Sequence, residues 1–295
     1  MSELNGKETA SRYRVRIEKE VNNLRKNKII PTIAPILVGN DPGAKVYFRQ
    51  KKKLANELGI RFAGVKLGPS TTMEELSRKI RELNQDERIS GLFVELPLPD
   101  NLDFREISKL INVEKDIDCI NPMNSGVLFS GGATDRSYEQ LKNDPSFLLP
   151  ATPYGVLELL IANGIEVQGK ETVVVGGGAI GLPVAMLLLR KSYSTVTICE
   201  YREDNLKEKT KRADILISAI GKRDFISDEM VKNGAVVLDV GINQTKNGIT
   251  GDVDYEAVKR VASYITPVPG GVGPMTTTMI MSNTVKAAKN LNDYY

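Results

Sequence analysis

Two residues in the stretch AKVYFRQKKK could act together on a substrate. Read as a helix, residues 44–53 place Tyr47 and Lys51 four positions apart, one above the other on the same face. A tyrosine and a lysine held in this way could lie over a bound molecule. The same letters also describe a solvated basic turn that contains one aromatic residue, so the spacing alone leaves both interpretations open.

Carboxylates near the end of a strand-like run are a second candidate. Glu95 follows the apolar run GLFV and precedes LPLP, so it lies at the carboxyl end of a predicted parallel strand, where open α/β sheets bind their ligands. Asp116 and Asp118 occur in KDID. On charge alone, these two residues are typical of a surface.

A glycine pattern predicts a phosphate-binding turn. Gly176, Gly178 and Gly181 form G-x-G-x-x-G between the strand-like TVVV and an apolar helical stretch, and Glu200 follows 22 residues after Gly178. Glycines permit the tight turn and the close approach of a pyrophosphate, and the acid accepts hydrogen bonds from the adenosine ribose. A turn that serves only packing is the alternative. A carboxylate at this position repels a 2'-phosphate and favours NAD, whereas Arg202 leaves NADP open.

The segment TPVPGGVGPMTTTM is also unusual. Its prolines and glycines over residues 267–274 predict a rigid loop that leads into a helix N-terminus. We expect this loop to close over a nicotinamide and a substrate, and a plain turn between domains is the alternative.

Composition excludes several classes of protein. The 295 residues contain 40 basic and 37 acidic side chains, two cysteines and no histidine. The small net charge argues against nucleic acid and membrane surfaces as partners, and the missing histidine excludes imidazole bases and histidine-bound metals. We expect a small-molecule substrate, no metal and a cytoplasmic location, because no targeting or membrane-spanning segment is apparent.

Strand-like and helical patterns alternate along the chain, which predicts two α/β domains with parallel sheets. We expect an N-terminal catalytic domain over 1–147 plus 276–295 and a Rossmann-type dinucleotide-binding domain over 148–275. Pro35 predicts an edge or a bulge for the strand TIAPILVG. Residues 127–149 are expected to be loop, as is VEKDIDCINPMNSG before them.

Several blocks together resemble one family, the methylenetetrahydrofolate dehydrogenase/cyclohydrolases. They are VGNDPGAKVYFRQKKKLANELGI, GLFVELPLP, EKDIDCINPMNSG, PATPYGV, ADILISAIGK and PVPGGVGPMT, in this order over nearly the whole chain. The resemblance implies a folate cleft between the domains. It also implies oxidation of 5,10-methylenetetrahydrofolate to the methenyl compound with NAD(P), and hydrolysis of that compound to 10-formyltetrahydrofolate.

The resemblance also implies residue roles. Tyr47 would stack on the folate ring system, Lys51 would be the catalytic lysine, and Asp118 would hold the pterin. Further folate contacts are expected at Leu96, Pro97, Gly271 and Pro274. Further cofactor contacts are expected at Ala179, Ile180, Gly241, Ile242 and Thr276.

The chain departs from the family pattern at four places. Glu95 stands where the family usually has Gln, Ala44 where it has Ser, and Cys119 where it has Gly, and the turn GGGAIG is shorter and lacks an arginine used for NADP. The last change favours NAD. A carboxylate beside Lys51 favours the ammonium form, so we expect the cyclohydrolase to be the weaker activity.

Two other functions stay open at this point. A related two-domain dehydrogenase of another small substrate, of the shikimate type, would not need Tyr47 and Lys51 in a folate cleft. A non-catalytic NAD-binding regulator would bind the cofactor without turnover. We also expect a homodimer.

Overall fold

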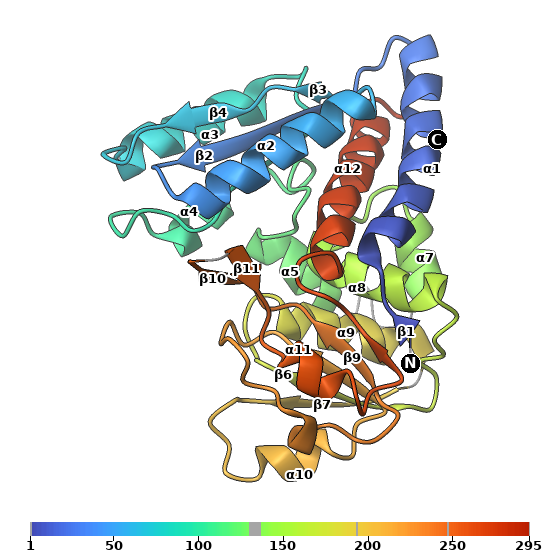
Figure 1. Cartoon of the computed structure of the whole chain (residues 1–295). Helices are drawn as coiled ribbons and strands as arrows, with labels where there is room; N and C mark the ends of the chain where they lie inside the picture. Colours follow the sequence, from blue (N-terminus) through green and yellow to red (C-terminus); the bar gives the residue numbers. More distant parts are fainter. Residues whose placement is uncertain (1, 130–136, 193, 247, 295) are drawn as a thin grey trace. The chain divides into compact units, whose positions relative to one another are not determined.

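The computed structural model describes residues 2–129, 137–192, 194–246 and 248–294, and the chain forms two compact α/β units (Figure 1). Unit 1 comprises Met1–Arg12, Thr134–Gln140 and Thr152–Thr278, and unit 2 comprises Tyr13–Ala133, Leu141–Ala151 and Met279–Tyr295. Four helices have residues in both units: α1 (Gly6–Lys26), α7 (Tyr138–Asn143), α8 (Ala151–Ala162) and α12 (Val272–Asn290).

Unit 2 contains the predicted parallel sheet. Strand β2 (Thr32–Val38) lies in its centre, with β3 (Arg61–Phe62) and β4 (Val65–Leu67) on one side and β5 (Gly91–Val94) on the other. Every residue of β2 and β5 is buried. The apolar runs in the sequence are therefore strands of a sheet whose two faces are covered.

The expectation that Pro35 marks an edge or a bulge is wrong, because Pro35 lies in the central strand and pairs in register with Phe93 of β5. The carbonyls of Pro31 and Ile33 accept hydrogen bonds from Arg61 and Ala63, so odd-numbered residues of β2 face β3 and β4. Pairing stops after β3 and resumes at β4. The missing amide of Pro35 faces this break and costs no ladder hydrogen bond.

The helices of unit 2 begin at clear capping residues. Asp41 accepts a hydrogen bond from the Ala44 amide at the start of α2 (Pro42–Glu57), and Thr72 and Glu75 form a capping box at α3 (Met73–Gln85). Helix α2 packs on β2 and β3. The remaining helices of the unit are α4 (Phe104–Leu110) and α5 (Pro122–Phe129).

The segment expected to be loop contains helices. Helix α5 begins at Pro122 inside the turn-rich block and reaches Phe129, and α7 follows at Tyr138, whereas 130–136 lie outside the described residues. Leu128 of α5 and Tyr138 of α7 are fully buried. Tertiary packing therefore stabilises short helices whose polar and glycine-containing sequence does not predict them.

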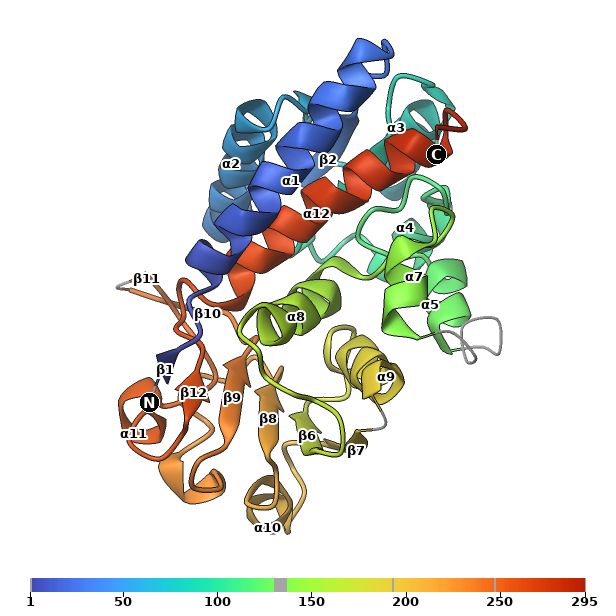
Figure 2. The ribbon, with the colours of Figure 1, turned by 90° about the vertical axis from the view of Figure 1, so that its right-hand side faces the viewer.

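Unit 1 contains a six-stranded parallel sheet with the order β1-β12-β9-β8-β6-β7 (Figure 2). Strand β6 (Glu171–Val175) pairs with β7 (Thr195–Cys199) on one side and with β8 (Ile215–Ser218) on the other. The order of the strands reverses at β6. The carboxyl end of β6 is therefore the switch point where sheets of this type bind ligands.

The other elements complete the sheet and its connections. Strand β1 (Ser2–Glu3), which the sequence pattern did not predict, pairs with β12 (Tyr264–Ile265). The remaining elements are α8 (Ala151–Ala162), α9 (Gly181–Ser192), α10 (Leu206–Thr210), η1 (Asp228–Met230), β9 (Val236–Asp239), β10 (Asn243–Thr245), β11 (Gly248–Thr250) and α11 (Tyr255–Val258). Within the described ranges, no helix has the length and apolar character needed to cross a membrane.

Candidate active site

Lys51 and Glu95 form an ion pair in the interior of unit 2. The Lys51 ammonium lies 2.6 Å from Glu95 Oε2, and the two side chains are 9% and 5% exposed. Helix α2 supplies the lysine, and the segment directly after β5 supplies the glutamate. The structure thus brings together two predicted residues that are 44 positions apart in the sequence.

The second oxygen of Glu95 is unusual. Glu95 Oε1 is buried and has no hydrogen-bond partner among the described residues. Burial raises the pKa of the Glu95 carboxyl, and Lys51 opposes this rise. An acceptor without a partner in the interior is costly, so this oxygen is available to a donor that arrives with a ligand or a water.

Two aromatic rings lie beside the ammonium group. Lys51 Nζ is 5.9 Å from the ring centroid of Tyr47 and 4.7 Å from that of Phe93. The predicted alignment of Tyr47 and Lys51 on one face of α2 is therefore present. Phe93 was not predicted, although its place in the apolar strand two residues before Glu95 is the sequence feature that could have indicated it.

Asp118 belongs to the same charge cluster. Burial raises the pKa of the Asp118 carboxyl to about 7, with Lys51 lowering it and Asp116 and Glu95 raising it further. The backbone amide of Ala151, at the start of α8, donates a hydrogen bond to it. Asp118 is partly exposed, whereas Asp116 is fully buried. A carboxyl that is both accessible and poised near neutrality suits the binding of a ligand with N–H donors.

Asp116 has a structural role that the sequence did not indicate. Its carboxylate accepts hydrogen bonds from the backbone amides of Ile120 and Asn121 and from the Asn124 side chain. These bonds fix the loop that follows Asp118. The expectation of an ordinary surface acid is wrong for Asp116, because its side chain is fully buried. The groups that donate to it are two backbone amides and one side-chain amide, all within eight residues of it.

Asn283 fixes the same loop from α12. Its side-chain amide donates to the carbonyls of Ile117 and Leu149 at 2.8 and 2.7 Å. The residue was not predicted, but an asparagine within the apolar stretch MIMSNTVKAA is the feature that could have indicated it. Cys119 completes the loop with φ at +54°. This conformation favours glycine, the residue that the resemblance leads one to expect there.

Leu96 and Pro97 follow Glu95 at the end of β5. Leu96 is 53% exposed, which is high for a leucine next to a buried ion pair, and Pro97 is exposed as well. Both side chains are therefore accessible to a ligand near Glu95.

The glycine turn of unit 1 has room for a phosphate. Gly176 has φ of +108°, and a Cβ there would lie 2.4 Å from the Ala219 carbonyl oxygen, while a Cβ at Gly181 would lie 1.8 Å from the Gly176 oxygen. Packing therefore explains these two glycines. A Cβ at Gly178 would meet nothing within 4 Å, so packing does not explain this third glycine, whereas a ligand close to the backbone does. The turn is compatible with a dinucleotide.

The end of β7 carries groups that could contact a ribose. Glu200 Oε1 accepts a hydrogen bond from the Gly177 amide at 3.3 Å, which places the acid beside the turn. Arg202 donates to the Tyr201 hydroxyl at 2.8 Å, and Lys222 lies 4.0 Å from the Tyr201 ring centroid. Ala179 and Ile180 complete the turn, and Ile180 is 40% exposed.

A carboxylate network that the sequence did not indicate supports the neighbouring loops. Asp252 is fully buried and accepts hydrogen bonds from the backbone amides of Ile220, Gly221 and Lys222 at 2.7 to 3.1 Å. It also accepts from Ser218 and Asn243. The block TGDVDYEAV contains this residue, but nothing local distinguishes it from the exposed acids nearby.

Asp239, at the end of β9, belongs to the same network. It accepts from the backbone amides of Gly241, Asp252 and Val253, and burial raises its pKa to about 7. A Cβ at Gly241 would lie 2.1 Å from the Asp252 carboxylate. Gly241 is therefore required by packing here, and the exposed Ile242 beside it is accessible.

The remaining predicted residues lie in unit 1. Gly271 is buried, and its amide donates to the Pro267 carbonyl, while Pro274 lies in the first turn of α12 and is half-buried. The Thr276 hydroxyl donates to Thr152. Among the residues with assigned positions, no group of three or more cysteine and carboxylate side chains could hold a metal ion.

Fold and site together define the class of protein. Unit 1 has the architecture of a dinucleotide-binding domain, and unit 2 holds a buried lysine and carboxylate pair with accessible aromatic and acidic groups beside it. Two family profiles match the sequence: "Tetrahydrofolate dehydrogenase/cyclohydrolase, catalytic domain" over residues 4–118 and "Tetrahydrofolate dehydrogenase/cyclohydrolase, NAD(P)-binding domain" over residues 150–292. The chain belongs to the tetrahydrofolate dehydrogenase/cyclohydrolase family, which confirms the resemblance.

Individual relatives agree over almost the full length. The chain is 48% identical to the bifunctional protein FolD of Acetivibrio thermocellus over 288 residues, which cover 97% of this chain and 96% of the relative. Its structure resembles that of the bifunctional FolD of Campylobacter jejuni, with a TM-score of 0.89, 39% identity, and coverage of 98% and 99% of the two chains. The FolD of Trypanosoma brucei, described in complex with NADP and an inhibitor, has a TM-score of 0.88 at 34% identity and coverage of 97% and 96%.

Proposed function

We propose that the protein oxidises 5,10-methylenetetrahydrofolate to 5,10-methenyltetrahydrofolate with NAD(P) and hydrolyses the product to 10-formyltetrahydrofolate. The observation that carries this proposal is the buried pair of Lys51 and Glu95 beside Tyr47 and Asp118, in a chain of this family. The shikimate-type dehydrogenase and the non-catalytic regulator are not favoured, because both family profiles match.

The oxidation depends chiefly on how the protein holds the folate. Asp118 accepts hydrogen bonds from the pterin N–H groups, and Tyr47 offers a ring face on which the folate rings stack. Leu96 and Pro97 supply accessible apolar surface next to them. Their positions support the proposed roles as folate contacts, and Gly271 and Pro274 are proposed as further contacts.

The dinucleotide belongs to unit 1. Gly176, Gly178 and Gly181 would hold its pyrophosphate, and Glu200 would accept hydrogen bonds from the adenosine ribose. When bound, the nicotinamide supplies the hydride acceptor. Further contacts are proposed at Ala179, Ile180, Arg202, Gly241, Ile242 and Thr276.

The hydrolysis needs an activated water. A water oxygen adds to the methenyl carbon and one proton is released. The bond from that carbon to N5 then breaks as the formyl carbonyl forms, and the second proton of the water moves to N5. The ammonium of Lys51 cannot accept the proton while it is paired with Glu95, so we propose that this activity is weaker than the oxidation. Glu95 as the base for the water is the second candidate, and the unpartnered Oε1 favours it.

We further propose that NAD is preferred over NADP. The Glu200 carboxylate lies on the turn, where it repels a 2'-phosphate. Arg202 and Lys222 are the two cations beside Tyr201, and they favour NADP as the alternative. Replacement of Glu200 by Ser removes the repulsion of a 2'-phosphate and should narrow the difference in kcat/KM between the cofactors. A wild-type protein that uses NADP better would contradict this role of Glu200.

We propose domain limits of 1–147 plus 276–295 and 148–275, a cytoplasmic location and a homodimer. Strand β7 is an edge strand of its sheet, and Ile198 on it is 41% exposed, which supports an association through unit 1. Light scattering after size-exclusion chromatography would give the mass of the particle and test the dimer.

One assay tests the proposed function directly. The purified protein is given methylenetetrahydrofolate with NAD and with NADP side by side, and the reduced cofactor and the methenyl compound are followed by absorbance. Methenyl hydrolysis is measured separately and corrected for the uncatalysed rate. A protein that binds folate and dinucleotide without forming either product would contradict the proposal.

A further inference from the structure

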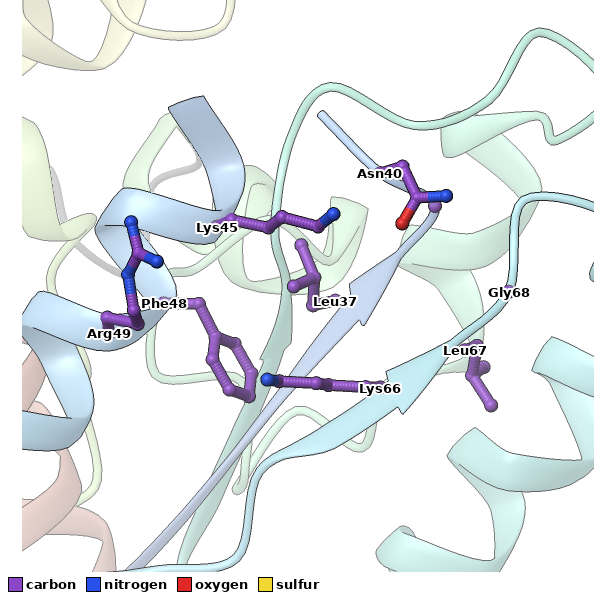
Figure 3. Close-up of a pocket in the computed structure, with 9 residues that line it drawn as sticks. Leu37, Asn40, Lys45, Phe48, Arg49, Lys66, Leu67 and Gly68 are labelled. Atoms are coloured by element: carbon purple, nitrogen blue, oxygen red, sulfur yellow. The ribbon is translucent and has the colours of Figure 1, made fainter. Parts of the chain in front are cut away.

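Unit 2 contains a pocket of about 310 Å³, which lies at the carboxyl ends of β2 and β4 and is bounded by the start of α2 (Figure 3). The side chains of Lys45 and Arg49 from α2, Lys66 from β4 and Asn40 after β2 surround it. None of these residues belongs to the folate or dinucleotide sites proposed above.

The pocket carries three positive charges and no negative one. No acidic residue lines it, and Lys45, Arg49 and Lys66 have no ion pair within the described part of the chain. Five other surface cations of the unit are paired: Lys53 with Glu57, Arg78 and Lys79 with Glu82, Arg88 with Asp86 and Lys109 with Glu106. Three unpaired cations around one hollow form an attractive site for an anion.

The walls of the pocket are already in place. Phe48 is buried and packs edge-on against Phe62, with ring centroids 5.1 Å apart. The ammonium of Lys66 lies 5.5 Å from the Phe48 ring centroid, which holds the cation over a fixed surface. Gly39 and Gly68 also line the pocket without side chains. A ligand can therefore reach the backbone at these points without displacing side chains.

The pocket is distinct from the catalytic cluster. At about 100° per residue, Lys45 and Arg49 project from the side of α2 opposite to Tyr47 and Lys51. The catalytic side chains and the two pocket cations of α2 therefore lie on opposite sides of the helix. An occupant would contact the same helix that carries the catalytic lysine, which provides a physical route for it to influence the reaction.

We propose that this pocket binds a small phosphorylated molecule. Its volume lies at the lower end of the range for small-molecule sites, so a compound with one or two phosphate groups would fill it. The guanidinium of Arg49 can donate a pair of hydrogen bonds to phosphate oxygens, and the two lysines add point charges. Phe48 and Leu37 supply an apolar wall for the rest of the ligand.

Inorganic pyrophosphate is the probe for a calorimetric titration of the full-length protein at low salt without divalent cations. NAD is present at saturation, so that the glycine turn of unit 1 is occupied. The test variant is Lys45→Gln with Lys66→Gln. The matched control is Lys53→Gln with Arg78→Gln, which removes two paired cations of the same unit. Thermal unfolding without ligand shows that both variants fold.

The expected result is saturable binding to the wild-type protein, with Kd at least about tenfold higher in the pocket variant and unchanged in the control. Equal affinity in wild type and pocket variant would overturn the proposal, as would the absence of binding at about 10 mM pyrophosphate. Citrate serves as a carboxylate comparison. Tighter binding of citrate than of pyrophosphate would overturn the assignment to phosphate.

Discussion

The two units bury carboxylates in different ways. In unit 1, Asp252 accepts five hydrogen bonds, three of them from consecutive backbone amides. In unit 2, Glu95 is also buried but has only the ammonium of Lys51 on one oxygen and no described partner on the other. Both are acids at the carboxyl side of a sheet, yet only Asp252 has hydrogen-bond donors on both of its carboxylate oxygens.

This difference distinguishes a structural carboxylate, Asp252, from a carboxylate that can bind or react with a ligand, Glu95. A carboxylate surrounded by backbone donors fixes loops and has no free lone pair to offer a ligand. A carboxylate with an unsatisfied oxygen keeps part of its desolvation cost in the free protein, and a substrate or a water can recover it. We therefore expect substitutions at Asp252 to lower stability, and substitutions around Glu95 to change the chemistry.

Replacement of Lys51 by Met should have the largest effect. Loss of the ammonium leaves Glu95 buried without its partner and removes the proposed catalytic lysine, so methenyl hydrolysis should fall by about a hundredfold or more. Hydride transfer depends mainly on positioning and should fall less. Steady-state assays of both activities check this, with Lys53→Met on the exposed side of the same helix as control. An equal loss of both activities in a folded variant would contradict this division of roles.

Asp252→Ala tests the scaffold side of the comparison. The change leaves three backbone amides without an acceptor, and unfolding in urea should show a loss of about 3 kcal/mol or more. Dinucleotide affinity should fall as well, because the loop at 220–222 follows β8 beside the glycine turn. Asp254→Ala, which removes only the cap of the short helix α11, is the control. Unchanged stability of Asp252→Ala would show that the network is not structural.

The pH dependence of folate binding tests Asp118. Its pKa is raised to about 7 by burial, and the pterin N–H groups bind only the ionised carboxylate. Affinity should therefore rise with pH and level off above neutrality, so the Kd for tetrahydrofolate should be about tenfold higher at pH 6 than at pH 8. In Asp118→Asn the Kd for tetrahydrofolate should not change with pH, and binding should be weaker than in the wild type. A wild-type profile equally flat over this range would exclude the carboxylate as the titrating group.

Glu95→Gln should have the smallest effect, and its direction decides between two accounts. If the ion pair suppresses hydrolysis, the neutral amide no longer stabilises the ammonium form of Lys51. The neutral amine can then accept a proton from water, and methenyl hydrolysis should rise a few-fold. If Glu95 is the base for the water, hydrolysis should fall. Rates for both proteins from pH 6 to 9, corrected for the uncatalysed reaction, separate the two. The stability of the variant should change little, in contrast to Asp252→Ala.

Local patterns in the sequence determined much of this protein. The strand, glycine turn and helix at 172–192 follow from residues that are neighbours in the chain, and the same holds for the shared face of Tyr47 and Lys51, because helical geometry fixes the i to i+4 spacing. The order of the sequence blocks was sufficient to indicate the family. None of these features requires knowledge of which distant segments touch.

Only the tertiary structure decided how the charged residues are used. Three acids lie in similar polar sequence: Asp116, Asp118 and Asp252. Their burial and hydrogen bonding differ because the fold brings different backbone amides and cations to each of them. The meeting of Lys51 with Glu95, the unsatisfied Oε1 and the place of Pro35 at a break between β3 and β4 depend on packing between segments far apart in the chain. Burial turns such encounters into large differences in energy, because a polar group removed from water depends on the few partners that the fold supplies.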